Sequence, residues 1–512
     1  MKISKNKAFS AKYNLVNGHY LTIFLLLLCT NFAKAEITGS RVYNIFQANC
    51  TTSGCHNHNE KAGNLDLQGG GETPEQDVGS FLYKGTPNNE ISQLENDYLV
   101  YPGQPYRSNI FNYIANNNNA NVELHDLEDP THLHRNLDVS ELEQEIIRQW
   151  ILEGANANVN VDLQAETEQI TLLEKFYNGE GAWSINPLNP PVKPAVDEGF
   201  QIRIGPIFLK PSDIVGGNLT DVVYNARYDF LNEEAIEINR IAAYIGASHH
   251  FIGYEYINKN LALAEPYGFI EDKAHNNKKN FGTFQESTDY MLPTGTAIYW
   301  EEETILDFQT HTTNYSEDLV LAYDVYLNVY TQQAGTASQE LKFKYYKNTG
   351  IAIPPNVDSY QEQNVIYSEN EEDREMYVWA MHSHTHLYGL DYDVFLRNAD
   401  GTKGEHIYDA SYYNGIPTCE WIGYNYETPP IRKFGSPLLH IDMLNGMIEE
   451  ATYFNDTNQT LVYGGSSTEN EMMLVSFAYV SDTMGVSFDK GSICYADEIN
   501  GISSVENVEN LN

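Results

Sequence analysis

Cysteine and positive charge are both scarce in this chain of 512 residues. It contains five Cys, and its 30 Lys and Arg are outnumbered by 71 Asp and Glu, so the formal net charge is −41. Such a polyanion repels the phosphates of nucleic acids and of anionic lipids, which excludes both as partners. The excess of acidic residues otherwise indicates a well solvated surface.

Long apolar runs are also missing, with one short exception near the N-terminus. Residues 1–35 contain five Lys and no acidic residue, an apolar stretch at 21–28, and the small-x-small sequence Ala33-Lys34-Ala35. This order predicts a signal peptide, and the short apolar run argues against an uncleaved anchor. We expect an exported protein, periplasmic or secreted, with no membrane insertion after cleavage. Loss of the five Lys lowers its net charge from −41 to −46.

The chain is too long for one domain, and an aromatic content of 12% favours β structure. A capping box at Ser140 and Glu143 predicts a helix before Gly154, and 42–48 predicts another. Residues 158–170 show no clear periodicity, whereas strand-like runs follow from 201 onward. We expect a mainly β fold with two antiparallel, jelly-roll-like sandwiches, at 198–340 and 341–490. Before them we expect a signal peptide at 1–35, a small α-helical domain at 36–157 and a linker at 158–197. An acidic tail at 491–512 follows them.

A haem-attachment pattern lies in the predicted helical domain. Covalent attachment needs two thiols and a His directly after the second, as in Cys50-Thr51-Thr52-Ser53-Gly54-Cys55-His56. Four residues separate the thiols where two are usual, and Ser53 and Gly54 allow the longer loop to bulge. The spacing alone leaves a local disulfide or a zinc site open.

The surrounding residues resemble small bacterial c-type cytochrome domains. The likeness rests on the cysteine motif, on Leu65-Asp66-Leu67, on Tyr101-Pro102-Gly103, and on the helix that ends Trp150-Ile151-Leu152-Glu153-Gly154-Ala155. It implies a haem c bound by Cys50, Cys55 and His56.

The second haem ligand departs from that resemblance. Such domains usually supply a Met, yet this chain has no Met between residues 2 and 290. His125, His132 and His134 lie in the corresponding region instead. We therefore expect bis-His ligation through His132 or His134, which lowers the haem potential. If the first two thiols hold haem, Cys419 and Cys494 are left to form a disulfide in an oxidising compartment.

Histidines in the predicted sandwiches form a second constellation. His384 and His386 are two residues apart in a strand-like run, with His382 beside them, so they share one face. Met472 adds a thioether, and His with Met favours copper over zinc. Ordinary half-exposed histidines and a core methionine are the alternative.

His249 and His250 are adjacent, and His311 follows much later. Neighbours on a regular strand point to opposite faces, so both reach one metal only at a strand end or a β-bulge. Gly246 and Ser248 permit such an irregularity. Unrelated surface histidines are the alternative.

The ordered set HH…H…HTH…EM resembles the copper type II ascorbate-dependent monooxygenases, the group containing dopamine β-hydroxylase and peptidylglycine α-hydroxylating monooxygenase. The resemblance implies two coppers facing each other across an open, solvent-filled cleft. The copper on His249, His250 and His311 would pass electrons. The copper on His384, His386 and Met472 would bind O2 and hydroxylate a C–H bond of a small organic substrate. Ascorbate or a redox protein would donate electrons, with the haem feeding the tri-histidine copper.

Departures from that family narrow the substrate. Its peptide-hydroxylating members carry an Arg two residues before the HTH pair, where this chain has His382. They also carry Asn and Tyr after the Met, where this chain has Leu474 and Ser476. The resemblance therefore does not extend to the peptide carboxylate clamp, and we expect an activity other than peptide amidation. A copper and haem electron carrier is the second hypothesis, and a zinc hydrolase is a weaker third, because no HExxH sequence is present.

Overall fold

The computed structural model describes residues 37–62, 65–68, 99–115, 134, 137–155, 163–185, 190–230, 232–271, 277–284, 287–369, 374–412, 421, 423–426, 429–435, 437–464 and 470–488. The predicted signal peptide, His125, His132, Cys419, Cys494 and the acidic tail from 491 lie outside these residues. Within the described part the chain is mainly β, and it forms several sheets whose strand pairs are mostly antiparallel.

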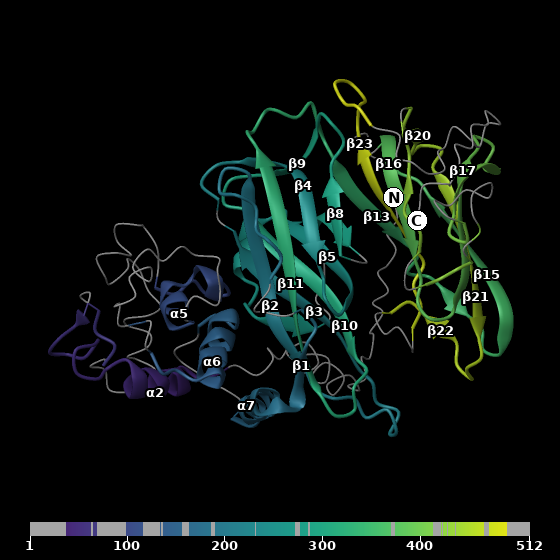
Figure 1. Cartoon of the computed structure of the whole chain (residues 1–512). Helices are drawn as coiled ribbons and strands as arrows, with labels where there is room; N and C mark the ends of the chain where they lie inside the picture. Colours follow the sequence, from purple (N-terminus) through teal and green to yellow (C-terminus); the bar gives the residue numbers. More distant parts are fainter. Residues whose placement is uncertain are drawn as a thin grey trace, which may run out of the picture.

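A small helical unit precedes the sheets (Figure 1). Its helices are α2 (Gly39–Asn49), η2 (Pro105–Arg107), α5 (Asn109–Ile114) and α6 (Glu141–Leu152). Helix α6 begins with the predicted capping box, in which Ser140 Oγ accepts from the Glu143 N–H. Both predicted helices are confirmed. Their apolar faces share one core that includes Phe46, Phe111 and Trp150.

The range 158–197, which we expect to be a linker, contains regular secondary structure among its described residues. Helix α7 spans Leu163–Lys175, is followed by the irregular turn η5 (Phe176–Glu180), and leads into strand β1 (Gly181–Trp183). The segment looks polar because it buries few apolar side chains, but Ile170 and Leu173 enter the helical core. Glu166 also accepts hydrogen bonds from Thr38, which ties α7 to the start of α2.

The first sandwich comprises two sheets. One has the order β1-β11-β4-β9-β12, with β2 beside β11 and β8 beside β4, and the other has the order β6-β3-β10-β5-β7. The strands are β2 (Gly199–Leu209), β3 (Thr220–Asp229), β4 (Ile236–Tyr244), β5 (Ser248–Tyr256), β6 (Phe269–Glu271), β7 (Lys278–Phe284), β8 (Thr288–Met291), β9 (Thr296–Trp300), β10 (Ile305–Asn314), β11 (Val320–Gln332) and β12 (Gln339–Glu340). The short helix α8 (Lys259–Leu263) follows β5.

The second sandwich also pairs two main sheets. These have the orders β13-β23-β16-β19, with β20 beside β16, and β15-β21-β17-β18, and a short β14-β22 pair completes them. The strands are β13 (Lys342–Lys347), β14 (Ala352–Ile353), β15 (Val357–Ile366), β16 (Glu375–His384), β17 (Gly389–Arg397), β18 (Lys403–Asp409), β19 (Arg432–Lys433), β20 (Leu439–Asp442), β21 (Met447–Asn455), β22 (Leu461–Val462) and β23 (Leu474–Val480). The strand-like run that holds His384 and His386 divides into two strands, β16 and β17, with a short loop between them.

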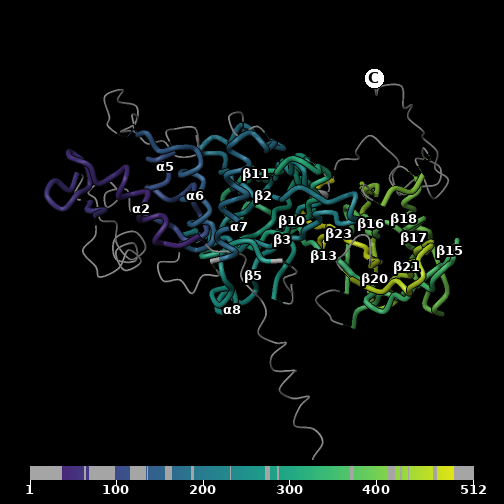
Figure 2. Tube along the Cα trace, turned by 90° about the horizontal axis from the view of Figure 1, so that it is seen from below, coloured from purple at the N-terminus to yellow at the C-terminus, as the bar shows by residue number. Residues whose placement is uncertain are grey.

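The two sandwiches meet directly, and the helical unit lies on the far side of the first one (Figures 1 and 2). Trp379, Ala380 and Val480 of the second sandwich belong to the same apolar cluster as Phe281 and Phe308 of the first. The interface between the sandwiches is therefore a continuation of the apolar core of the first sandwich rather than a hydrated surface contact. None of the helices among the described residues has the length and apolar character needed to cross a membrane.

Candidate functional site

The cysteine motif lies at the end of α2. Cys50 caps this helix, and the loop turns back so that the His56 N–H donates to the Cys50 carbonyl at 3.0 Å. Gly54 has a φ of +86°, which supplies the bulge that the longer spacing requires. Cys50 and Cys55 are not joined by a disulfide. Burial, with the nearby Cys55 and Glu143, raises the pKa of the Cys50 thiol to about 12.

His56 and His134 face each other above this motif. Their Nε2 atoms lie 3.5 Å apart, and their rings are nearly parallel, with an interplanar angle of 14°. The other nitrogen of His56, Nδ1, lies 3.2 Å from the Leu65 carbonyl, which fixes the ring. A metal bound axially by two imidazoles separates their nitrogens by roughly 4 Å, at about 2 Å per bond. The observed 3.5 Å is about half an ångström shorter than this, so the rings would have to separate slightly to hold an iron ion between them. His134 is the described member of the predicted pair.

The tri-histidine motif lies where β5 pairs with β10. His250 and His311 are direct partners in this ladder, and the register shifts so that Ser248 is opposite Thr312. His249 is therefore the extra residue of a β-bulge, the irregularity that two adjacent ligands require. Of the two irregularities considered, a strand end or a bulge, the ladder has the bulge, and the His249 side chain lies outside the described part of the structure.

His250 and His311 present nitrogens at ligand spacing. The distance from His250 Nε2 to His311 Nδ1 is 3.3 Å. Two imidazole nitrogens on one tetrahedral ion, each about 2.05 Å from it, are roughly 3.4 Å apart. The residues present thus suit a shared metal ion.

Asp221 is a functional candidate that the sequence did not reveal. It lies on β3, and its Oδ1 is 2.9 Å from His311 Nε2, so it accepts from the ring nitrogen turned away from His250. Thr313 Oγ1 donates to the same oxygen at 2.7 Å. Metal-bound imidazoles commonly donate their second N–H to a carboxylate, which fixes ring orientation and tautomer.

The second histidine pair lies at the end of β16. His384 is the last residue of this strand and His386 follows it in the loop, so the predicted placement of both on one strand is only partly right. Their ring centroids are 5.3 Å apart. Burial lowers the pKa of His384 well below its usual value, helped by the neighbouring His386, His382 and His311. A neutral imidazole is the form that binds metal.

Glu471 connects this histidine pair to Met472. Its carboxylate is fully buried and accepts from three backbone N–H groups, those of His386 at 2.9 Å, Tyr388 at 2.8 Å and Met472 at 3.0 Å. The Asn470 carbonyl also lies 3.1 Å from His386 Nδ1, which leaves Nε2 to face a ligand. In the sequence, the Glu471-Met472 pair indicates a ligand role for the Met472 thioether but none for Glu471. The structure adds that the preceding Glu holds both ligand segments together.

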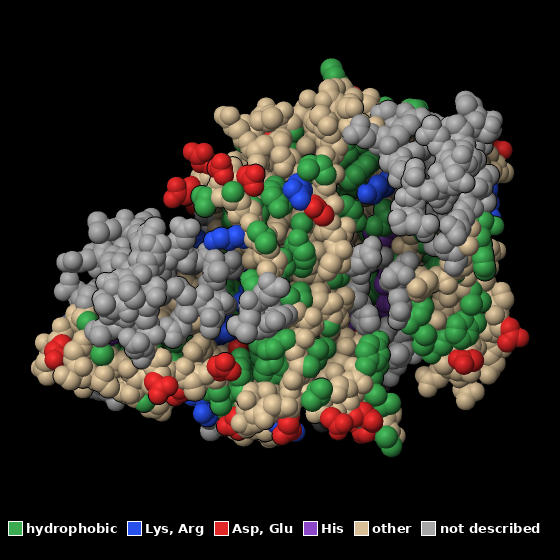
Figure 3. Space-filling view, viewed as in Figure 1, with side chains coloured by type: hydrophobic (Ala, Val, Ile, Leu, Met, Phe, Trp, Pro, Cys, Tyr) green, Lys and Arg blue, Asp and Glu red, His purple; other side chains and the backbone are tan. Residues whose placement is uncertain are grey.

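The two metal candidates meet across the sandwich interface. The ring centroids of His250 and His384 are 6.0 Å apart. This distance leaves no room between these two rings for the open, solvent-filled cleft that the family resemblance implied. Histidine side chains are visible inside the seam between the sandwiches in Figure 3.

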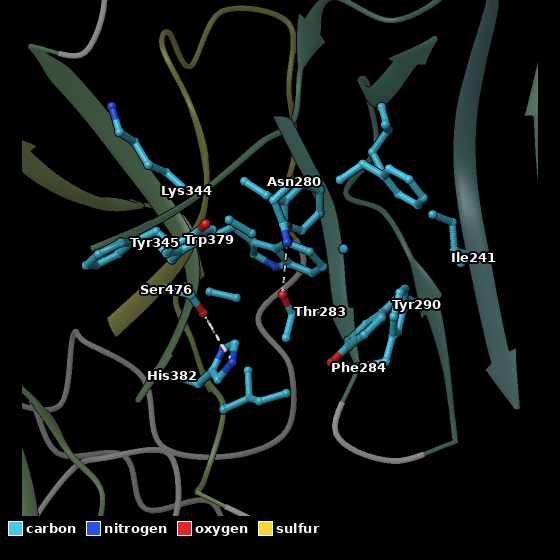
Figure 4. Close-up of a pocket in the computed structure, with 18 of the residues that line it drawn as sticks. Ile241, Asn280, Thr283, Phe284, Tyr290, Lys344, Tyr345, Trp379, His382 and Ser476 are labelled. Atoms are coloured by element: carbon cyan, nitrogen blue, oxygen red, sulfur yellow. Dashed lines mark hydrogen bonds between the residues drawn. The ribbon is translucent and has the colours of Figure 1, made fainter. Parts of the chain in front are cut away.

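A narrow cavity of about 60 Å³ opens beside His382 in the same interface (Figure 4). Its walls are mainly aromatic and aliphatic, and they include Phe281, Phe284, Tyr290, Trp379 and Phe477. The Ser476 hydroxyl lies 2.8 Å from His382 Nδ1. Burial lowers the pKa of His382 to about 4, so its imidazole is neutral near pH 7.

Comparisons with known proteins do not assign this chain to a family. No family model matches it, and no curated protein matches it. Among solved structures, the chain is similar to the PBCV-1 protein VP54 fitted into a reconstruction of the virophage Sputnik, at 10% identity and a TM-score of 0.20, covering 57% of this chain and 95% of that one. It is also similar to the PBSX exported protein XepA, at 9% identity and a TM-score of 0.15, covering 56% and 89%. A β-porphyranase from Bacteroides plebeius gives 10% identity and a TM-score of 0.14, covering 52% and 37%. Likenesses this weak support no functional argument.

Proposed function

We propose that this chain is an exported copper- and haem-dependent monooxygenase, with a cytochrome c-like helical domain followed by two copper-binding β-sandwiches. One observation carries the proposal. Two imidazole pairs lie at one apolar interface: His250 and His311 have nitrogens 3.3 Å apart, and His384 and His386 have ring centroids 5.3 Å apart. The pairs meet where the ring centroids of His250 and His384 are 6.0 Å apart. When bound there, copper would supply one-electron chemistry and the activation of O2.

The residues at each site are suited to different work. His249, His250 and His311 would form an all-nitrogen site, oriented by Asp221. His384, His386 and Met472 would form a site with a thioether, which favours the reduced ion. The buried Glu471 would keep the second site rigid when the ion's charge changes, because its three N–H donors fix the ligand backbone.

The cavity beside His382 would hold the reacting part of the substrate. His382 precedes His384 by two residues on β16, and its neutral ring with Ser476 offers hydrogen bonds rather than positive charge. The apolar walls exclude water and favour a neutral aliphatic or aromatic group. These properties do not suit a peptide carboxylate, in agreement with the missing Arg.

Electrons would enter on the side of the helical unit. A cleft of about 880 Å³ runs between α7 and β3, and Asp221, the partner of His311, lies on its wall. Ascorbate or a redox protein could reach the His311 site from there. The haem motif is farther away, since the first sandwich separates the helical unit from the interface (Figure 2). Its two sheets alone are about 10 Å apart.

Metal analysis and oxygen uptake test the proposal. We expect two coppers and one haem per chain, and O2 consumption with ascorbate that matches formation of an oxygenated product from a panel of neutral aromatic compounds. Met472→Ala should abolish product formation while the haem is still reduced. Full activity in protein stripped of copper would contradict the proposal.

An electron carrier is the second candidate, and the close approach of His250 and His384 favours it. Such closeness supports rapid exchange between two metals without requiring a substrate. A carrier would exchange electrons with ascorbate but form no oxygenated product.

A further inference from the structure

A third cluster of metal-ligating side chains lies away from all the residues discussed so far. Asp393 is on β17, and His406 and Asp409 are on β18, the last strand of the β15-β21-β17-β18 sheet. One ligand atom from each residue lies within 4.8 Å of the other two. The cluster shares no residue with either histidine pair or with the haem motif.

The pleat of β17 directs this cluster outward. Tyr392 and Val394 enter the core of the second sandwich, so Asp393 between them projects from the opposite face of the sheet. Asp393 and Asp409 are direct partners in the β17-β18 ladder. The irregular register on the His406 side of this ladder brings that residue into the same group.

The three side chains are held in place by their neighbours. His406 Nε2 lies 2.8 Å from Asp393 Oδ1, and the His406 ring stacks on Phe395 with centroids 4.4 Å apart. Asp409 is 8% exposed, and its Oδ1 accepts from the Ser411 N–H at 2.8 Å. These contacts fix the rotamers before any ion arrives, which lowers the entropic cost of binding one.

Negative charge accumulates here. Asp391 is a third carboxylate nearby, and its Oδ1 accepts from the Ser411 hydroxyl at 2.7 Å. Burial, followed by repulsion from Asp393 and Asp391, raises the pKa of Asp409 to about 6. The basic side chain closest along β18, Lys403, pairs with Glu450 on the neighbouring strand β21. A bound cation would relieve the repulsion between the carboxylates.

We propose that Asp393, His406 and Asp409 bind a divalent first-row cation of the Zn²⁺ or Mn²⁺ type. Two carboxylates and one imidazole suit such ions, whereas Ca²⁺ and Mg²⁺ prefer oxygen alone and Cu⁺ prefers sulfur. The ion clips the edge strand β18 to β17, across the stretch where the ladder is irregular. The site is structural and does not depend on the proposed monooxygenase chemistry.

Zinc binding to the full-length, copper-saturated protein tests this site. After dialysis against Zn²⁺, elemental analysis should find one zinc per chain more in the unmodified protein than in Asp393→Asn. The thermal midpoint should rise with free Zn²⁺ in the unmodified protein and stay constant in the variant. His406→Gln, which removes the imidazole but leaves both carboxylates, should also lose the zinc.

Two controls keep the result interpretable. Glu375→Gln disrupts a different carboxylate-imidazole pair of the same sandwich, with His440, and should retain the zinc. His384→Ala removes a proposed copper ligand and should also retain the zinc. Circular dichroism shows whether each variant is folded. If a cluster variant does not fold, the near-isosteric Asp409→Asn is used in its place. Equal zinc content and equal thermal shifts in the cluster variants and the unmodified protein would overturn the proposal.

Discussion

The imidazoles of His250 and His384 lie 6.0 Å apart, although one belongs to the first sandwich and the other to the second. Each also has an imidazole partner within its own sandwich: His311 lies beside His250, with nitrogens 3.3 Å apart, and His386 lies beside His384, with ring centroids 5.3 Å apart. The interface therefore brings together two separately built metal candidates.

Magnetic resonance can test this closeness. Dipolar coupling between two unpaired spins grows with the inverse cube of their separation. We expect the spectrum of the fully Cu²⁺-loaded protein to be broadened or weakened relative to His311→Ala and His386→Ala, which each disrupt one site. A spectrum equal to the sum of the two variant spectra would contradict the expected proximity.

Asp221→Asn should weaken metal binding at the His311 site. The change preserves shape but removes the charge that His311 Nε2–H meets at 2.9 Å. Loss of such an outer partner typically lowers metal affinity about 10- to 100-fold. Competition with a copper chelator measures it. Asp213→Asn, an exposed carboxylate of the same sandwich, is the control and should leave both affinities unchanged.

Glu471→Gln should damage the other site selectively. Glu471 accepts hydrogen bonds from the backbone N–H groups of His386, Tyr388 and Met472. A Gln side chain has an NH2 group in place of one carboxylate oxygen, so at least one of these N–H groups loses its acceptor. A buried donor without an acceptor costs about 1–3 kcal/mol, so we expect lower stability and weaker copper binding. Denaturant titration and copper titration measure the two effects.

Glu449→Gln is the matched control for that substitution. Glu449 is also fully buried in the second sandwich but accepts from Asn364 and Tyr392 instead. It should affect stability without changing copper affinity. If both variants lose copper equally, Glu471 has no particular role in positioning the ligands.

His134→Ala should remove one axial haem ligand. The geometry with His56, with Nε2 atoms 3.5 Å apart, predicts a low-spin bis-His spectrum that this variant loses. His132→Ala should keep the spectrum, and so should His58→Ala, whose ring pairs with Asp66 at 2.6 Å. The reverse pattern for the first two variants would assign the ligand to His132.

Acid should destabilise the metal-free protein through His382. Its pKa is about 4 in the folded chain, below the value of about 6.5 expected when unfolded, so the unfolded state binds the proton more readily. This contribution is fully present above about pH 6.5 and is lost as the pH falls toward about 4. The urea midpoint should therefore fall between pH 7 and pH 5.

His382→Gln should make that fall smaller, although His384 shifts in the same direction and will preserve part of it. His440→Gln, which removes an exposed imidazole that contacts Glu375 in the same sandwich, is the control substitution. An unchanged slope in His382→Gln would show that this imidazole does not titrate on unfolding.

Local sequence signals predicted the fold most successfully. The capping box at Ser140 determines where α6 begins, because all of its hydrogen bonds lie within one turn. The adjacency of His249 and His250 indicated that shared ligation needs a strand end or a bulge, and the ladder contains a bulge at that point. Helix α7 was missed because its burial depends on Ile170 and Leu173 meeting a core formed by distant helices.

The supporting carboxylates could not be found in this way. Asp221 is 90 residues from His311, and only the pairing of β3 with β10 brings them together. Glu471 adjoins Met472, but its role depends on backbone donors from the loop after β16. Side chains that bind metal have recognisable chemistry in a sequence, whereas those that orient them are defined by tertiary contacts.

One residue, Leu341, separates the last strand of the first sandwich from the first strand of the second. It is 1% exposed, and its N–H donates to the Ala297 carbonyl at 2.8 Å. The described ligands of each metal candidate lie within a single sandwich, so a rotation at this joint changes the spacing between the pairs without disturbing either coordination shell. Because the two sandwiches share one apolar core, their packing sets this spacing, and a substitution in that core would change the distance between the two histidine pairs.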